Sequence, residues 1–329
     1  MQSLSRARRN FTLSVVSMAF TAGAIAQSPT ENWPTKAVTL IAPFTPGGTT
    51  DIVARALANQ LQIIWKQPVI VDNRPGAGGT VGAAAVARAN PDGYTLLLAN
   101  VGHAAAPALY KNLPYDFVKN LDSITNVALV PNILLVPKSL PVNNVGELIK
   151  YMKDSKQPVS YGSAGIGSTQ HLSAELLKSM ANVDAVHVPY KGAAPMMTDL
   201  IGERLEFAID SAGSAASQIS GGNVKAIGIT TAKRTASFPN LPTLNESGLP
   251  GYTSTTWYSI STTAGTPQPI KDKLYQSIVQ ALATPGMKNV LAGMSAEPGG
   301  MPPAEFDRYV RSEVKRWTDL ITNSATIKE

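Results

Sequence analysis

The sequence predicts an α/β protein built from two lobes. The chain has 329 residues, which exceeds the roughly 250–300 residues at which a single hydrophobic core stops growing. Its composition, 44% hydrophobic and 15% charged residues, is typical of a packed protein and unlike that of a disordered one. Short apolar runs alternate with amphipathic segments along most of the chain. This alternation predicts strands followed by helices in a mostly parallel sheet.

Residues 1–26 are predicted to form a cleaved signal peptide. Arginines precede a moderately apolar stretch at 11–22, and Ala24-Ile25-Ala26 has the small-x-small pattern that signal peptidase recognises. Serines and threonines interrupt the apolar stretch, which falls short of the about 20 apolar residues that a membrane span needs. The mature chain is therefore expected to begin at Gln27. Paired arginines leave export by the Sec or the Tat route open.

Charge and cysteine content narrow the function classes. The formal charge of +6 falls to +3 on cleavage, because residues 1–26 carry three Arg and no acid (6 − 3). The remaining basic residues form no clustered runs, so neither nucleic acid nor a membrane surface is an expected partner. The absence of cysteine excludes disulfides and thiolate chemistry.

The first lobe begins with a near-continuous apolar run at 37–43, which predicts a strand buried on both faces. A glycine turn at 44–48 follows, and the hydroxyl and carboxyl groups at 49–51 can cap the start of a helix. Asp51 is interpreted as such a cap rather than as a ligand contact. Strand, turn and helix recur at 68–72, 76–79 and 80–89, with a further strand at 94–99. In such sheets, ligands lie at the carboxyl ends of the strands.

A second α/β series starts near Asn126. Its predicted strands lie at 127–136, 158–161, 185–189, 205–210 and 225–230. Its predicted helices lie at 145–155, 169–181 and 194–201.

After Gly251 the pattern changes to an extended segment and two amphipathic helices, the last with an apolar stripe from Phe306 to Ile321. Such a stripe must pack against a hydrophobic core, and we expect the helix to return to the first lobe. Residues 27–126 plus 251–329 would then form lobe 1, and 127–250 an inserted lobe 2. Two crossing segments, near Asn126 and Gly251, would allow hinge closure.

Known catalytic and nucleotide-binding motifs are absent from the sequence. The turn at 76–82 has Val81 where a dinucleotide fingerprint needs its third glycine, and the turn at 162–169 has Ser168 where a P-loop needs lysine. No nucleophile elbow or H-E-x-x-H motif is present, and the histidines lack ligand spacing. We therefore predict no enzyme activity, no cofactor and no metal site.

Three glycine turns, each opening a helix, are the chemical features that remain. Glycines let backbone N–H groups approach a ligand closely, and a helix N-terminus adds roughly half a positive charge. Such a site suits a carboxylate or phosphate without a formal cation. The alternative is that the glycines serve only to make tight turns.

Several segments resemble the signatures of one known family: 43–51, 73–79, 90–94, 161–168, 188–192, 241–243, 248–252 and 264–267. They are similar, in order, to those of the Bug-type (TctC-like) receptors, the substrate-binding proteins of tripartite tricarboxylate transporters. The match spans essentially the whole mature chain. It departs from the family pattern at 259–263, where relatives tend to carry a glycine and a more apolar run.

The resemblance implies a type II periplasmic-binding-protein fold, with two α/β lobes and a ligand cleft between them. It also implies a receptor that holds a small carboxylate through backbone N–H groups and ordered water. With the predicted signal peptide, we expect a periplasmic protein, and we expect it to be a monomer. The receptor would deliver this ligand to the membrane permease subunits of a tripartite tricarboxylate transporter. Dicarboxylates, tricarboxylates, amino acids and aromatic acids all remain open as ligands.

The resemblance also sharpens the candidate site residues. In the first lobe we expect an apolar wall, carboxylate donors and polar groups at the mouth of the third strand, namely Phe44, Thr49, Gly78, Gly79, Asn100 and His103. In the second lobe we expect the residues that close over the other end of the ligand, namely Ser163, Ala164, Ser168 and Thr169. Asp210 would orient a water or accept a hydrogen bond from an amine or an acid proton.

Two other classes of function are weighed against this interpretation. An enzyme acting on anionic substrates would need an activated nucleophile or an acid–base pair, and the sequence contains neither. A sensor that presents the bound carboxylate state to a membrane signalling partner would have the same sequence features, and it stays as the alternative.

Overall fold

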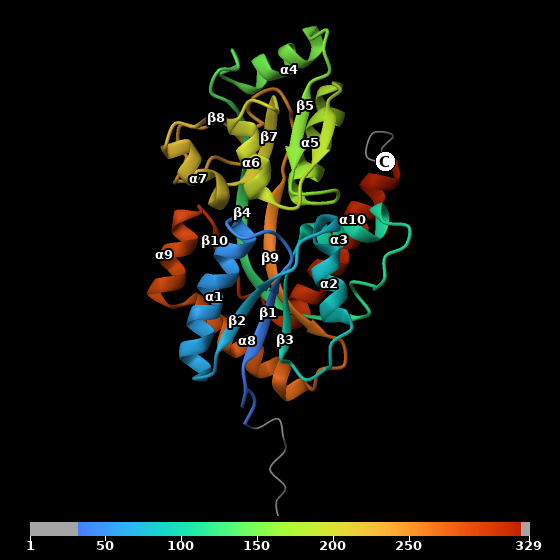
Figure 1. The fold of residues 1–329 in the computed structure, drawn as a ribbon, viewed down its shortest axis with the longest axis vertical. Coiled ribbons are helices and arrows are strands. Elements are labelled where there is room, and N and C mark those ends of the chain that lie inside the picture. Colours follow the sequence, from blue (N-terminus) through green and yellow to red (C-terminus); the bar gives the residue numbers. More distant parts are fainter. Residues whose placement is uncertain (1–31, 324–329) are drawn as a thin grey trace, which may run out of the picture.

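The computed structural model describes residues 32–323 and places them in two α/β lobes stacked along the long axis of the molecule (Figure 1). The predicted signal peptide, residues 1–26, lies outside the described residues. In the described part of the chain, no helix is long and apolar enough to cross a membrane. The predicted α/β class is confirmed.

The sheet of the first lobe has the strand order β2-β1-β3-β9-β4. Its strands are β1 (Val38–Ala42), β2 (Val69–Asn73), β3 (Thr95–Asn100), β4 (Leu121–Pro137) and β9 (Thr255–Thr263), and β10 (Glu297–Pro298) pairs with β4. β1 is parallel to β2 and β3, whereas β9 is antiparallel to β3 and β4. Helices cover this sheet: α1 (Thr49–Trp65), α2 (Thr80–Ala87), α3 (Val101–Leu109), α8 (Gln268–Leu282), α9 (Pro285–Gly293) and α10 (Pro303–Asn323).

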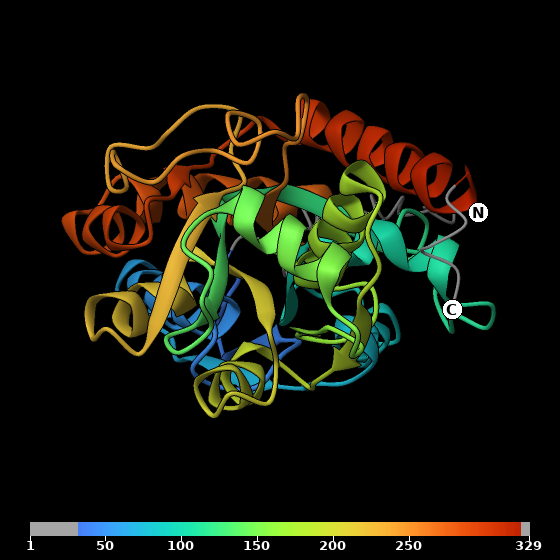
Figure 2. The same cartoon turned by 90° about the horizontal axis from the view of Figure 1, so that it is seen from above.

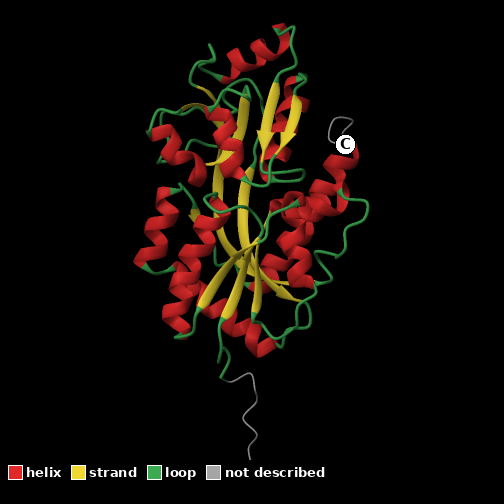
Figure 3. Cartoon of the chain, viewed as in Figure 1, coloured by secondary structure: helices red, strands yellow, loops and turns green. Residues whose placement is uncertain are grey.

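The second lobe continues the sheet from β4 in the order β4-β7-β5-β6, with β8 paired to β4 as well. Its strands are β5 (Ser160–Ser163), β6 (Val186–Pro189), β7 (Phe207–Ser211) and β8 (Val224–Ile229). Its helices are α4 (Val145–Asp154), α5 (Thr169–Ala181), α6 (Ala193–Ile201) and α7 (Ala212–Ser220). The strands run through the middle of both lobes, with helices on either side (Figure 3).

β4 and β9 are the two segments that connect the lobes. β4 pairs with β9 as far as Pro131 and with β7 from Asn132 onward. Asn132 Nδ2 donates to the Ser254 carbonyl at 3.2 Å, and Asn132 Oδ1 accepts from Thr256 Oγ1 at 2.8 Å. This buried asparagine therefore ties the two crossing strands together where the pairing changes. The lobe boundaries at 126/127 and 250/251 stay a prediction.

α10 packs on α3 and on β4 in the first lobe and runs along one side of the molecule when it is viewed from above (Figure 2). Phe306, Val310 and Trp317 of its apolar stripe are buried in one core with Trp257. The stripe thus covers the first lobe, as the sequence predicts.

α3 and α7 are not predicted by the sequence pattern. α3 contains Pro107 and is otherwise rich in alanine, and α7 consists largely of alanine, serine and glycine. Both segments consist mainly of small residues, so few large apolar side chains mark the face that packs on the core.

Candidate functional site

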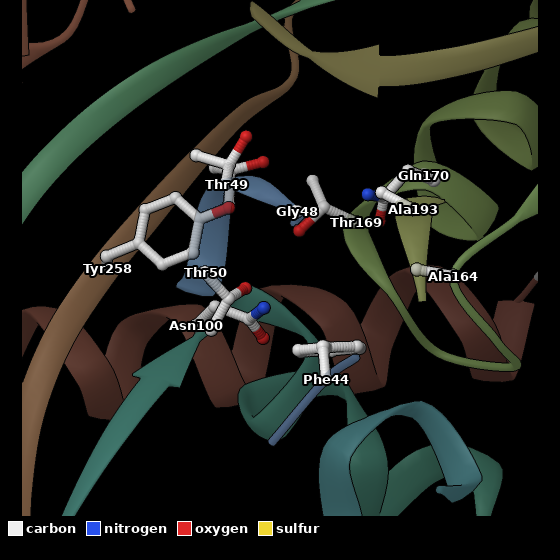
Figure 4. Close-up of a pocket in the computed structure, with 11 residues that line it drawn as sticks. Phe44, Gly48, Thr49, Thr50, Asn100, Ala164, Thr169, Gln170, Ala193 and Tyr258 are labelled. Carbon is white, nitrogen blue, oxygen red and sulfur yellow. The ribbon is translucent and has the colours of Figure 1, made fainter. Parts of the chain in front are cut away.

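A small cavity lies between the lobes. The side chains around it come from both lobes (Figure 4). They are Phe44, Gly48, Thr49, Thr50, Asn100, Ala164, Thr169, Gln170, Ala193, Thr256 and Tyr258. This set contains no Lys, Arg or His, so a bound anion would contact no cationic side chain of the wall.

The N-termini of several helices converge on this cavity. Thr49 begins α1, and Asn100 is the N-cap of α3. From the second lobe, Thr169 begins α5 and Ala193 begins α6. The first N–H groups of a helix have no intrahelical partner, and its N-terminus carries roughly half a positive charge. The cavity therefore favours an anion although no cationic side chain lines it.

Two threonine hydroxyls at these helix ends have no hydrogen-bond partner among the described residues. Thr49 and Thr169 are 3% and 1% exposed, and the Oγ1 atom of each is buried. A buried hydroxyl without a partner costs about 1–3 kcal/mol. A ligand that bonded to both hydroxyls would remove this cost from both lobes at once.

Asn100 and His103 form a capping box at the start of α3. Asn100 Oδ1 accepts from the backbone N–H of Gly102, and His103 Nδ1 accepts from the backbone N–H of Asn100 at 3.1 Å. Burial lowers the pKa of His103 to about 4, so the ring is neutral at neutral pH. Its Nε2 faces the carbonyl of Gly79 at 3.3 Å. His103 thus lies behind the cavity wall, whereas Asn100 lines it.

Gly78 and the turn at 162–167 belong to a contact between the lobes, which we call the interlobe seam. Its residues are Gly78, Gly102, Tyr110, Ile166 and Gly167. Tyr110 Oη donates to the Ile166 carbonyl at 2.7 Å. A Cβ atom on Gly78 would stand 2.0 Å from the same carbonyl oxygen. Gly78 lies beside the cavity at this contact, and Gly79 lies against His103 and Phe44.

The other second-lobe candidates lie in hydrogen-bond networks behind the cavity. Ser163 Oγ is 2.6 Å from His187 Nε2 and accepts from the N–H of Gly165. Ser168 caps α5 by accepting from the N–H of His171. Asp210 is fully buried at the end of β7. Of the predicted site residues, Phe44, Thr49, Asn100, Ala164 and Thr169 line the cavity.

Five further residues line the cavity and are not among the predicted site residues, namely Thr50, Gln170, Ala193, Thr256 and Tyr258. Thr50 and Gln170 directly follow Thr49 and Thr169, so their place in the first turn of a helix is a sequence signal that marks them. Thr256 and Tyr258 lie on β9, within the extended segment that the sequence predicts, but no local pattern indicates that their side chains face the cavity. Burial raises the pKa of Tyr258 to about 12, so its hydroxyl stays protonated.

Comparison with known protein families shows which family the chain belongs to. The family model described as "Tripartite tricarboxylate transporter family receptor" (TctC) matches residues 53–325. The chain belongs to this family. It is thus a solute-binding protein, and the resemblance to the Bug-type receptors is confirmed.

Curated relatives support the assignment. Protein BugT of Bordetella pertussis is 32% identical over 303 residues, which is 92% of this chain and 93% of that protein. A UPF0065 protein of the same species is 34% identical over 322 residues, 98% of each chain.

Solved structures of similar proteins share the fold. The periplasmic binding protein BugD has a TM-score of 0.87 at 36% identity and covers 90% of this chain and 100% of its own. An R. palustris protein solved with adipate has a TM-score of 0.85 at 38% identity, covering 88% and 97%. MatC from Rhodopseudomonas palustris, with bound malate, has a TM-score of 0.84 at 32% identity, covering 88% and 100%. The predicted periplasmic-binding-protein fold is confirmed, and these matches are binding proteins rather than enzymes.

Proposed function

We propose that this family member binds a small carboxylate in the cavity between its lobes. The observation that carries the proposal is the pair of helix N-termini, α1 and α5, that face the cavity from opposite lobes. Each presents a buried threonine hydroxyl without a partner in the described chain. Helix N–H groups and hydroxyls are donors suited to carboxylate oxygens. The adipate and malate bound to two structural neighbours support the same ligand class.

Ligand binding would stabilise the closed arrangement of the lobes. A ligand that bonds to Thr49 in one lobe and Thr169 in the other binds the closed form more tightly than the open one, and only this difference can drive closure. Shifting the population from 1:99 to 99:1 closed requires about 5.5 kcal/mol of differential binding. Small-angle scattering should show a smaller radius of gyration with ligand than without it. Equal radii would rule out signalling by closure.

A thermal-shift screen of the mature protein tests the ligand class. Monocarboxylates, dicarboxylates, tricarboxylates, amino acids and aromatic acids would be compared at equal concentration. A ligand at about 100 times its Kd stabilises the folded state by roughly 2.7 kcal/mol. At least one acid should raise the melting temperature and be recovered unchanged. A screen in which no acid does so, or in which an acid is converted to product, would refute the proposal.

We further propose that the protein is a periplasmic monomer that hands its ligand to the permease subunits of a tripartite tricarboxylate transporter. The family match and the similarity to the periplasmic binding protein BugD support this role. The sequence at 24–26 supports export with loss of residues 1–26. N-terminal sequencing of the exported protein should begin at Gln27. Recovery of a chain beginning at Met1 would refute the cleavage.

A further inference from the structure

Gln170 is a polar side chain in the cavity wall whose orientation is set by the protein. It is the second residue of α5 and follows Thr169, which begins the helix. Both residues lie on the second-lobe side of the cavity, opposite Thr50 and Tyr258 (Figure 4). Gln170 is only 9% exposed, so its amide has few alternatives to the contacts within the wall.

Asp210 determines which way the amide of Gln170 points. Asp210 Oδ1 accepts from the backbone N–H of Ser211 at 2.8 Å, and Gln170 Nε2 lies 3.1 Å from the same oxygen. The amide directs its NH₂ group to Asp210, and Oδ1 accepts from both the amide and the backbone.

The remaining oxygen of the carboxyl group is also satisfied within the lobe. Ser214 Oγ lies 2.6 Å from Asp210 Oδ2. Burial raises the pKa of Asp210, and the hydrogen bonds that it receives act in the opposite direction. No ion pair is recorded for Asp210 within residues 32–323. Asp210 is thus a rigid anchor for Gln170 and adds negative potential behind the amide whenever it is ionised.

Gln170 Oε1 is left as a fixed acceptor at the cavity. No hydrogen bond to this oxygen is recorded from the described residues, because the donor end of the amide is held by Asp210. The other polar groups of the cavity wall include the start of α5 and the side chain of Asn100, whose Oδ1 accepts from Gly102. A carboxylate on the α5 N-terminus would bring the substituent on its α-carbon next to Oε1.

We propose that Gln170, oriented by Asp210, makes this site select carboxylates that carry a hydrogen-bond donor on the α-carbon. An ammonium or a hydroxyl satisfies the Gln170 oxygen, whereas an unsubstituted methylene leaves it buried without a partner. An ionised Asp210 favours the ammonium over the hydroxyl. This inference rests on the proposed function, since it specifies the ligand class of the same cavity.

Matched acids of equal chain length test the selection by isothermal titration calorimetry. The sets are propionate, lactate and alanine; succinate, malate and aspartate; and glutarate, 2-hydroxyglutarate and glutamate. Within the set that binds most tightly, a donor-bearing acid should bind at least tenfold more tightly than the unsubstituted one. If the unsubstituted acid binds as tightly or more tightly, the inference is overturned. If no carboxylate of these sets or of the thermal-shift screen binds, the proposed function fails together with it.

Two variants separate the amide from the charge behind it. Gln170→Met keeps the side-chain volume and removes the acceptor, so the preference should fall below about threefold. Asp210→Asn keeps the acceptor for Gln170 and removes the charge, so the preference for the amine over the hydroxyl should fall while both remain favoured over the methylene. Gln218→Met is the control, because the Gln218 amide oxygen accepts from Asn223 in an exposed hydrogen bond. It should change neither the preference for donor-bearing acids nor the preference for the amine over the hydroxyl. A full preference retained in Gln170→Met would also overturn the inference. Thermal melts without ligand show whether each variant is folded.

Discussion

The interlobe seam and the cavity lie side by side between the lobes and differ in how they are packed. At the seam, backbone meets backbone: a Cβ atom on Gly78 would stand 2.0 Å from the Ile166 oxygen, and one on Gly102 would stand 2.6 Å from the Gly167 oxygen. The cavity instead has open space and buried hydroxyls without partners in the described chain.

This difference separates two tasks that a receptor must perform. Protein atoms already satisfy one another at the seam, so the seam sets how closely the lobes can approach. The cavity presents groups that only a ligand can satisfy, so it sets which molecule favours that approach. Substitutions in the seam should then weaken all ligands alike, whereas substitutions in the cavity should change affinity and selectivity.

Gly78→Val should have the largest effect. The valine side chain would collide with the Ile166 carbonyl of the other lobe, and the φ angle of +62° is one that valine rarely adopts. We expect ligand affinity to fall by more than about 100-fold and scattering to show no compaction with ligand. Gly222→Val is the matched control, since Gly222 has a φ of +66° with nothing within 4 Å. An affinity within threefold of wild type for Gly78→Val would remove Gly78 from the closing contact.

Thr169→Val should have a smaller effect of a different kind. It removes the unpartnered hydroxyl at the start of α5 while preserving shape, so affinity should fall by about tenfold. Without ligand, the variant should be as stable as wild type or slightly more stable, because a buried unsatisfied hydroxyl is lost.

Thr198→Val, whose hydroxyl donates to the Ala194 carbonyl on the exposed side of α6, serves as the control for Thr169→Val. Calorimetry and thermal melts measure both quantities. Loss of stability without loss of affinity would assign Thr169 a structural role only.

Tyr110→Phe should have the smallest effect. It removes one hydrogen bond across the seam, from Tyr110 Oη to the Ile166 carbonyl, and leaves the cavity unchanged. A loss of about 1 kcal/mol corresponds to roughly fivefold weaker binding, with the same factor for every ligand.

Tyr275→Phe removes a tyrosine-to-carbonyl bond within the first lobe, to Gly300 at 3.3 Å, and should leave affinity unchanged. Stopped-flow measurements should show faster ligand dissociation from Tyr110→Phe than from Tyr275→Phe. Equal rates in both would place the Tyr110 bond outside the closure equilibrium.

The sequence by itself determined the local elements and the type of site. Apolar runs, glycine turns and hydroxyl residues at helix starts are local signals, so they predict β1, α1 and α5 and place Thr49 and Thr169 at helix N-termini. The family signatures are also local, so they indicate the fold and the family without information on tertiary contacts.

Only the tertiary structure decided which of these residues meet. β4 extends back to Leu121 because it pairs with β9 there, although polar residues such as Asp122 and Ser123 hide this from the apolar pattern. His103 and Ser168 cap helices, while Tyr258 reaches the cavity from β9, far along the sequence from α1 and α3. Hydrophobic periodicity indicates which side chains of a segment are buried. The partner that a side chain finds depends on how distant segments pack, and no local pattern encodes that choice.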